Sequence, residues 1–237
     1  MTTNGLSSPR GLVALLTTAV ALAAITARAQ TTDAPALAAG ENAWSFSVAV
    51  DGYLLSGDRY YVGPTFTANR GRLHLEARSN YEDLNTGSAW VGANFSGGKT
   101  VGWRVTPMVG GVFGETSGIA PGLEASIKWR NLEGYGENEY VVDSNHRKDN
   151  FFYNWSELTL SPVDWFRFGM VTQRTRVYQS DRQIQRGVIV GVSSTHVNVT
   201  GYALNPDQDT RFVLAVELMF SGAGSGFSGR RRHPRRP

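Results

Sequence analysis

Apolar and polar residues alternate along most of the chain beyond residue 43. In the stretch Arg211–Phe220, every second residue from Phe212 onward is apolar, whereas the positions between them include Arg211 and Glu217. Successive side chains of an extended strand point to opposite faces, so a two-residue period is typical of a β-strand. The pattern therefore predicts a strand with one apolar face and one face that carries charge.

The same two-residue period recurs in segments separated by short turns. The predicted strands cover residues 43–55, 59–69, 72–81, 88–96, 101–113, 118–130, 132–143, 151–161, 165–178, 182–193, 196–204 and 210–220. Turns such as Arg70-Gly71 and Gly97-Gly98-Lys99 contain the glycine that tight turns favour. Because single-chain membrane barrels have even strand numbers, we predict an all-β fold, a closed antiparallel up-and-down transmembrane β-barrel of about 12 strands over residues 43–220.

The first thirty residues have the composition of an export leader. Arg10 precedes an apolar run over residues 11–26, and Ala27-Arg28-Ala29 matches a leader-peptidase site. The run is shorter than the roughly 20 apolar residues that a membrane-spanning helix needs. We therefore predict a cleaved secretory signal peptide at residues 1–29 and a flexible lead-in at 30–42. Residues 221–237 are predicted to form a disordered Arg-rich tail.

The two strand faces could be arranged in two ways. In a membrane barrel the apolar face meets lipid, whereas in a soluble periplasmic lipocalin-like barrel it would line the interior and bind an apolar ligand. Several aromatic residues fall near predicted strand ends, as the interfacial girdle of a membrane barrel requires: Trp44, Trp103, Trp129, Trp165 and Phe220. The charged residues also form continuous rows rather than loops. Both features favour the membrane barrel.

With that orientation, the charged face lines the lumen. The predicted lumen-lining residues are Arg72, His74, Glu76, Arg78, Arg104, Glu124, Lys128, Glu137, Glu139, Glu157, Arg167 and Glu217, and Asp51 and Arg211 share their face. Twelve strands enclose a narrow space, so the charges could either pair across the lumen and close it or leave a thin polar channel. Because the two signs nearly balance, we expect no strong ion selectivity.

Four arginines flank one predicted connection near residue 180. Arg174 and Arg176 share a face of the strand predicted at 165–178 with Phe168. Arg182 and Arg186 share a face of the strand predicted at 182–193 with its apolar residues. On the outer surface at head-group height, these residues could bind lipopolysaccharide phosphates. The alternative is a β-bulge that turns them inward toward the lumen carboxylates.

Composition limits the chemistry that the chain could carry out. There is no cysteine, which excludes disulfides and thiolate metal sites. Ser144 and His146 share one loop, but their spacing matches no lipid-hydrolase motif, and the other histidines show no metal-ligand spacing. We therefore predict no catalytic residue, no cofactor and no metal, although an outer-membrane lipid-modifying hydrolase remains an alternative.

The net charge of +3 depends on the two ends of the chain. Seven of the 23 basic residues lie in the predicted leader or tail, which leaves 16 basic against 20 acidic residues. A nucleic-acid-binding domain carries its positive charge on the folded part. The sequence therefore predicts that the protein does not bind nucleic acid.

The stretch from Phe151 to Gly169, with Gln173-Arg-Thr-Arg176 after it, resembles a functionally unassigned group of small bacterial outer-membrane barrels. The closing strand likewise resembles the terminal strand of such barrels, whose final Phe, here Phe220, is read by the barrel-assembly machinery. The resemblance implies a bacterial outer-membrane location and contact with outer-membrane lipids, but no activity. We expect a narrow passive channel or a structural envelope protein. The sequence does not indicate an oligomeric state.

Overall fold

The computed structural model describes residues 43–55, 59–82, 84–145, 149–177, 183–207 and 210–221. The predicted signal peptide, most of the lead-in and nearly all of the tail lie outside these residues. Within the described part of the chain, no helix is long and apolar enough to cross a membrane.

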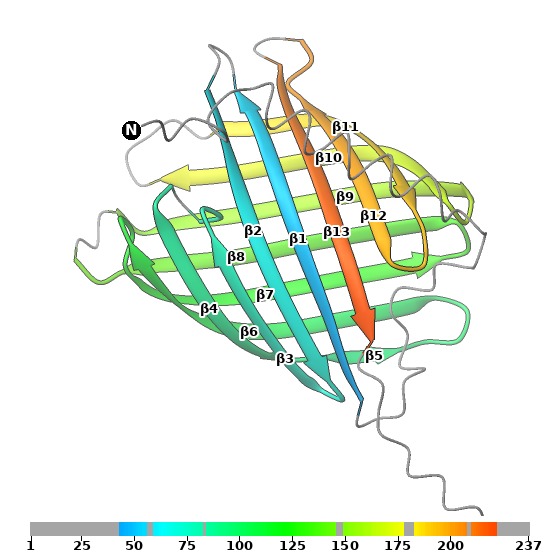
Figure 1. Ribbon diagram of the computed structural model, residues 1–237, viewed down its shortest axis with the longest axis horizontal. Coiled ribbons are helices and arrows are strands. Elements are labelled where there is room, and N and C mark those ends of the chain that lie inside the picture. The colour runs from blue at the N-terminus through cyan, green and yellow to red at the C-terminus, as the bar shows by residue number, and fades with distance from the viewer. Residues whose placement is uncertain are drawn as a thin grey trace, which may run out of the picture.

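The described residues form thirteen strand segments in a single antiparallel sheet (Figure 1). They are β1 (Trp44–Leu55), β2 (Arg59–Arg70), β3 (Leu73–Ser79), β4 (Thr86–Ala93), β5 (Phe95–Gly97), β6 (Gly102–Gly114), β7 (Gly118–Trp129), β8 (Leu132–Asp143), β9 (Phe151–Val163), β10 (Phe166–Val177), β11 (Gln183–Ser193), β12 (Val197–Leu204) and β13 (Arg211–Ser221). These bounds lie close to the predicted ones.

Two pairings close the sheet into a barrel. The first strand β1 pairs with the last strand β13, with Phe46 opposite Phe220. The segments β4 and β5 both pair with β6, and only Asn94 separates them, so together they act as one interrupted strand. The barrel therefore has twelve strands, which confirms the predicted fold class, and the strands of its near and far walls cross at a large angle (Figure 1).

The orientation of the two faces agrees with that of a membrane barrel. Large apolar side chains such as Val109, Ile119 and Met170 are exposed on the outer surface, whereas Glu76 and Glu139 are buried inside. A lipocalin-like barrel would show the opposite arrangement, so that alternative is wrong for this fold.

The interior also holds an apolar and aromatic core that the charged rows did not reveal. Trp90, on β4, is 3% exposed and packs in a cluster with side chains of β6, β8 and β9 such as Met108 and Trp155. Its ring needs glycine at the paired position of the neighbouring strand β6, because a Cβ on Gly110 would lie 2.4 Å from the indole. Part of the lumen is therefore filled by side chains, as in narrower barrels.

Candidate functional site

The Arg78 guanidinium is the centre of a charged cluster inside the barrel. Its side chain is 1% exposed. It starts on β3 and reaches carboxylates on β7 and β8. It lies 2.8 Å from Glu137 and 3.2 Å from Glu139, and its Nε donates to Glu76. Glu82 and Glu124 each lie 3.9 Å away. Five carboxylates therefore surround one cation in the part of the lumen that the structure describes.

Aromatic rings complete the surroundings of this guanidinium. It lies 4.4 Å from the ring centroid of Tyr81 and 4.9 Å from that of Trp90. The Tyr81 hydroxyl donates to Glu137 at 2.7 Å, and the Trp90 indole donates to Ser88. Removing the Arg78 guanidinium and its carboxylates from water is unfavourable unless each charge has close partners of opposite charge or hydrogen-bond partners. Arg78 thus links β3 to β7 and β8, which are not its neighbours in the sheet. This is the arrangement expected if charges pair across the lumen.

A second polar network lies on β9, β10 and β12. Glu157 accepts hydrogen bonds from Trp155 Nε1 at 2.8 Å and from the Tyr202 hydroxyl at 3.0 Å. Arg167 lies 3.8 Å from the same carboxylate and donates to Thr200. These contacts hold the Glu157 carboxylate in a fixed position on the lumen wall.

A cavity of about 250 Å³ lies between these two networks. Its wall includes four acidic residues, Asp51, Glu137, Glu157 and Glu217, and one basic residue, Arg167. Six aromatic side chains also line it, namely Tyr53, Tyr81, Tyr135, Tyr153, Trp155 and Tyr202. The cavity is therefore acidic and aromatic, whereas the full set of predicted lumen charges is nearly balanced.

The remaining predicted lumen residues lie in different environments. Arg104, on β6, and Lys128, on β7, are half-buried, and Arg104 is paired in register with Ser126. Glu217, on β13, accepts a hydrogen bond from Asn198 at 2.9 Å. All three lie on the inner wall, and Arg104 interacts electrostatically with Glu124 of the Arg78 cluster.

Arg72 is a correction to the sequence prediction. It precedes β3 in a turn, is exposed, and its guanidinium lies 5.5 Å from the ring centroid of the outward-facing Phe95. The alternating pattern was extended one residue too far, because the strand begins at Leu73. Arg72 is therefore a rim residue rather than part of the lumen wall.

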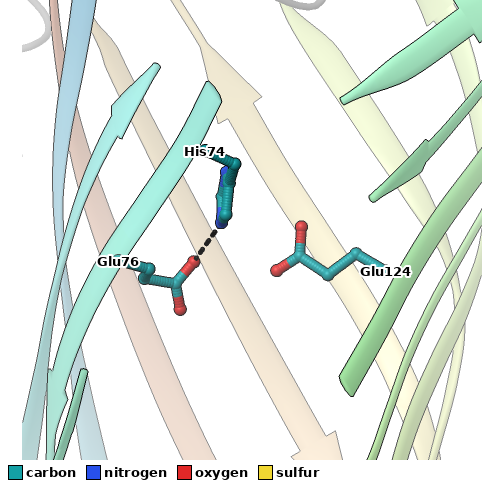
Figure 2. A group of neighbouring side chains, drawn as sticks. All are labelled: His74, Glu76 and Glu124. Atoms are coloured by element: carbon teal, nitrogen blue, oxygen red, sulfur yellow. Dashed lines mark ion pairs between the residues drawn. The ribbon is translucent and has the colours of Figure 1, made fainter. Parts of the chain in front are cut away.

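His74, Glu76 and Glu124 form the one group of potential metal ligands found among the described residues. His74 and Glu76 come from β3, whereas Glu124 reaches them from β7 (Figure 2). No metal site was predicted from the sequence, because ligands on different strands show no recognisable spacing.

Of the four arginines predicted to bind lipopolysaccharide phosphates, Arg174 and Arg186 lie on the outer face. Arg174 pairs in register with Ile184, whose side chain is 56% exposed, and the register of β10 is regular at this point. Arg186 donates to Asp207 at 2.7 Å, and this hydrogen bond lowers the pKa of Asp207, in the β12–β13 connection. The side chain of Arg176 and the whole of Arg182 lie outside the described residues.

The hydrolase alternative gains no support from the loop that suggested it. The Ser144 hydroxyl donates to the carbonyl oxygen of Ser117 at 2.8 Å. His146 lies outside the described residues, so no contact between it and Ser144 can be described.

The aromatic wall of the cavity was not predicted from the sequence, although the alternating pattern contained a signal for it. Tyr153 and Trp155 alternate in phase with Glu157, and Tyr53 alternates in phase with Asp51. Residues that share the phase of an inward carboxylate must face inward as well. The phase of the period, rather than residue polarity, identifies the lumen wall.

Comparison with known proteins supports the fold. No protein family matches this sequence, and no curated protein sequence matches it. Two solved structures of the KdgM porin, one in complex with disordered oligogalacturonate, are similar, with TM-scores of 0.56 and 0.55 at 10% and 11% identity. Each match covers 73% of this chain and 99% of the porin chain. The Acinetobacter baumannii outer membrane protein Omp33 also matches, with a TM-score of 0.45 at 10% identity over 76% of this chain and 100% of that chain.

At this level of identity the similarity concerns the fold alone. The chain has the fold of an outer-membrane β-barrel porin, which confirms the resemblance inferred from its strands.

Proposed function

We propose that this protein is a narrow passive outer-membrane channel that favours small cations and small neutral polar solutes. The observation that carries this proposal is the acidic cavity inside the barrel, where Asp51, Glu157 and Glu217 face Arg167. An excess of one sign of charge on the wall of a narrow cleft concentrates ions of the opposite sign. Cations should therefore enter this cavity more readily than anions.

The size of the cavity limits what could pass. A volume of about 250 Å³ is below the roughly 300–1,000 Å³ of typical ligand pockets. The Arg78 cluster narrows the same lumen, because the guanidinium projects from β3 and contacts Glu137 and Glu139 on the non-adjacent strand β8. The proposed solutes are therefore hydrated ions and small polar molecules rather than polymers.

The ligand of the KdgM porin is not proposed for this chain. That porin was solved in complex with oligogalacturonate, in which each sugar carries a carboxylate. Four carboxylates and one guanidinium line the cavity of this chain, and like charges repel. A shared fold therefore does not imply a shared solute.

Export and assembly form part of the proposal. A signal peptide cleaved after residue 29 would deliver the chain to the periplasm. Phe220, which pairs with Phe46 at the closing seam and is 51% exposed, would act as the terminal residue read by the barrel-assembly machinery.

Planar-bilayer recording tests the channel function. In a salt gradient we expect the reversal potential of the wild-type protein to show a preference for K⁺ over Cl⁻. A charge about 4 Å from an ion in water contributes about 1 kcal/mol, so Glu157→Gln and Glu217→Gln should each lower the permeability ratio by up to about fivefold. Glu115→Gln, at an exposed position outside the cavity, is the matched control and should leave the ratio unchanged. An anion preference would contradict the proposed selectivity, and complete absence of conductance would favour a structural envelope protein.

We also propose that the outer-face arginines bind lipopolysaccharide phosphates. Arg174 and Arg186 lie on adjacent strands, and Arg174 Nε has no hydrogen-bond partner among the described residues. A guanidinium at head-group height could donate two hydrogen bonds to a phosphate. The ion pair of Arg186 with Asp207 would compete with this contact, so Arg174 should contribute more.

Lipopolysaccharide that co-purifies with the barrel measures this contact. Arg174→Gln combined with Arg186→Gln should lower the retained amount about tenfold or more, because a hydrogen bond to a charged group contributes about 1.5–3 kcal/mol. Arg130→Gln, at an exposed turn where the guanidinium lies over Trp129, should not change it. Equal retention by all variants would contradict a phosphate contact.

A further inference from the structure

We infer that His74, Glu76 and Glu124 form a binding site for a divalent first-row metal ion, with Zn²⁺ the best match (Figure 2). This inference goes beyond the proposed channel function and holds whether or not the barrel conducts ions. The site would lie inside the lumen, between the wall formed by β3 and the wall formed by β7.

The distances fit a common ion. One nitrogen of His74 and one oxygen from each glutamate all lie within 4.8 Å of one another. His74 Nε2 lies 3.3 Å from Glu76 Oε2. Two atoms bound to a tetrahedral zinc at about 2.0–2.1 Å are separated by about 3.3 Å. The pair on β3 therefore already has the spacing of two zinc ligands, and a Glu124 oxygen, from β7, lies within 4.8 Å of both.

A chain of hydrogen bonds fixes the tautomer of His74. Thr106 donates to Asn94 Oδ1, and Asn94 Nδ2 donates to Asn69 Oδ1, both at 2.7 Å. Asn69 Oδ1 is therefore an acceptor, and His74 Nδ1 lies 3.0 Å from it as the donor. In a neutral imidazole, Nε2 then carries the lone pair. A ring N–H held by an amide or carboxylate oxygen is the usual outer support of a metal-bound histidine.

The lone pair of His74 Nε2 points into the cluster and lacks a hydrogen bond. The residue is 4% exposed, and Nε2 is among the buried atoms of the described chain that make no hydrogen bond. A lone pair that faces a carboxylate oxygen at 3.3 Å is repelled unless a cation lies between them. Either a metal ion or a second proton on the imidazole would supply that cation.

The surrounding charge favours a metal ion. Arg78 is shared by five carboxylates within 4 Å, which include both glutamates of the proposed site. Arg104, on β6, is a second cation that interacts electrostatically with Glu124. Two guanidinium groups still do not neutralise five acids, and buried unpaired charges are unfavourable. A divalent cation between His74, Glu76 and Glu124 would neutralise two of them. Arg78, which already contacts an oxygen of Glu76, would hold that carboxylate in place.

The site has room for the ring and access from the lumen. Gly92 lies beside the imidazole, because a Cβ at that position would approach His74 Cδ2 to 3.4 Å and Met108 Cβ to 2.8 Å. The Glu124 side chain is 22% exposed, whereas that of Glu76 is 6% exposed. An ion could therefore reach the site past Glu124, and a fourth position would remain open to water, as in zinc sites with three protein ligands.

Metal titration of the folded full chain tests the inference. After treatment with a chelator, the wild-type protein should bind one Co²⁺ per chain, with visible absorption bands of tetrahedral cobalt that Zn²⁺ abolishes. His74→Gln should weaken Zn²⁺ binding by more than about 100-fold, because even an outer-shell partner contributes about 10–100-fold. Glu124→Gln should weaken it at least about tenfold. Calorimetry with Zn²⁺ measures both effects.

Two control variants separate this site from other metal-binding residues. His196→Gln, in an exposed turn, and Glu217→Gln, elsewhere on the lumen wall, should bind Zn²⁺ as the wild type does. If His74→Gln fails to migrate as a folded barrel on unheated gels, Asn69→Ala keeps the three ligands and should still weaken binding about 10–100-fold. Saturable Zn²⁺ binding that persists undiminished in a folded His74→Gln barrel, or no saturable binding by the wild type, would overturn the inference.

Discussion

Replacing Arg78 with Met is expected to lower the free energy of unfolding of the barrel by about 3–5 kcal/mol. Methionine keeps much of the packing against Tyr81 and Trp90 but removes the cation that Glu137 and Glu139 approach at 2.8 and 3.2 Å. Buried carboxylates without a positive partner are strongly unfavourable. Urea unfolding of the lipid-refolded protein measures the loss.

Two further variants test whether the loss of stability in Arg78→Met comes from the unpaired buried carboxylates. Arg72→Met, at the exposed rim, should change stability by no more than about 0.5 kcal/mol. Adding Glu137→Gln to Arg78→Met should restore part of the loss, because neighbouring charges are coupled. Removing one partner from a buried ion pair typically costs more than about 1 kcal/mol. If the free energy of unfolding of Arg78→Met lies within that amount of the wild-type value, the guanidinium does not hold β3 to β7 and β8.

Placing an arginine at Val109 is expected to lower stability by about 2–4 kcal/mol, the range measured for a charge on the lipid face near the bilayer midplane. Val109 lies in the middle of β6, is 47% exposed, and is flanked in register by Val91 and Pro121. The same unfolding assay in lipid vesicles measures the effect.

Val101→Arg is the matched control for this substitution. Val101 immediately precedes β6, is 39% exposed, and shares the outward phase of Val109. At the interface the same charge should cost only about 0–1 kcal/mol. Equal effects at the two positions would mean that this face meets water rather than lipid, and the orientation of the barrel would then be wrong.

The channel and metal proposals depend on different parts of the lumen. Asp51, Glu157 and Glu217 act through the cavity near β1, β9 and β13, whereas His74 and Glu124 lie on β3 and β7. Selectivity and metal binding can therefore be altered separately, and the loss of one property in a variant does not imply the loss of the other.

Local sequence was sufficient for the strands and their faces. The alternation in β7, with Leu123 and Ile127 outward and Glu124 inward, follows from backbone geometry alone. The predicted fourth strand is interrupted at Asn94 in the structure, but both parts pair with β6, so the strand count remained correct. Arg72 was misplaced by one residue because alternation does not mark where a strand ends.

Which inward side chains meet was decided only by the closed barrel. Arg78 and Glu139 are 61 positions apart and belong to strands that are not neighbours in the sheet, yet closure brings them to 3.2 Å. His74 and Glu124 meet for the same reason. The two-residue period specifies the face of each residue, but the stagger and tilt of the strands set its height in the lumen. The sequence by itself therefore determined the wall of this barrel, and tertiary structure determined its cavity and its charge cluster.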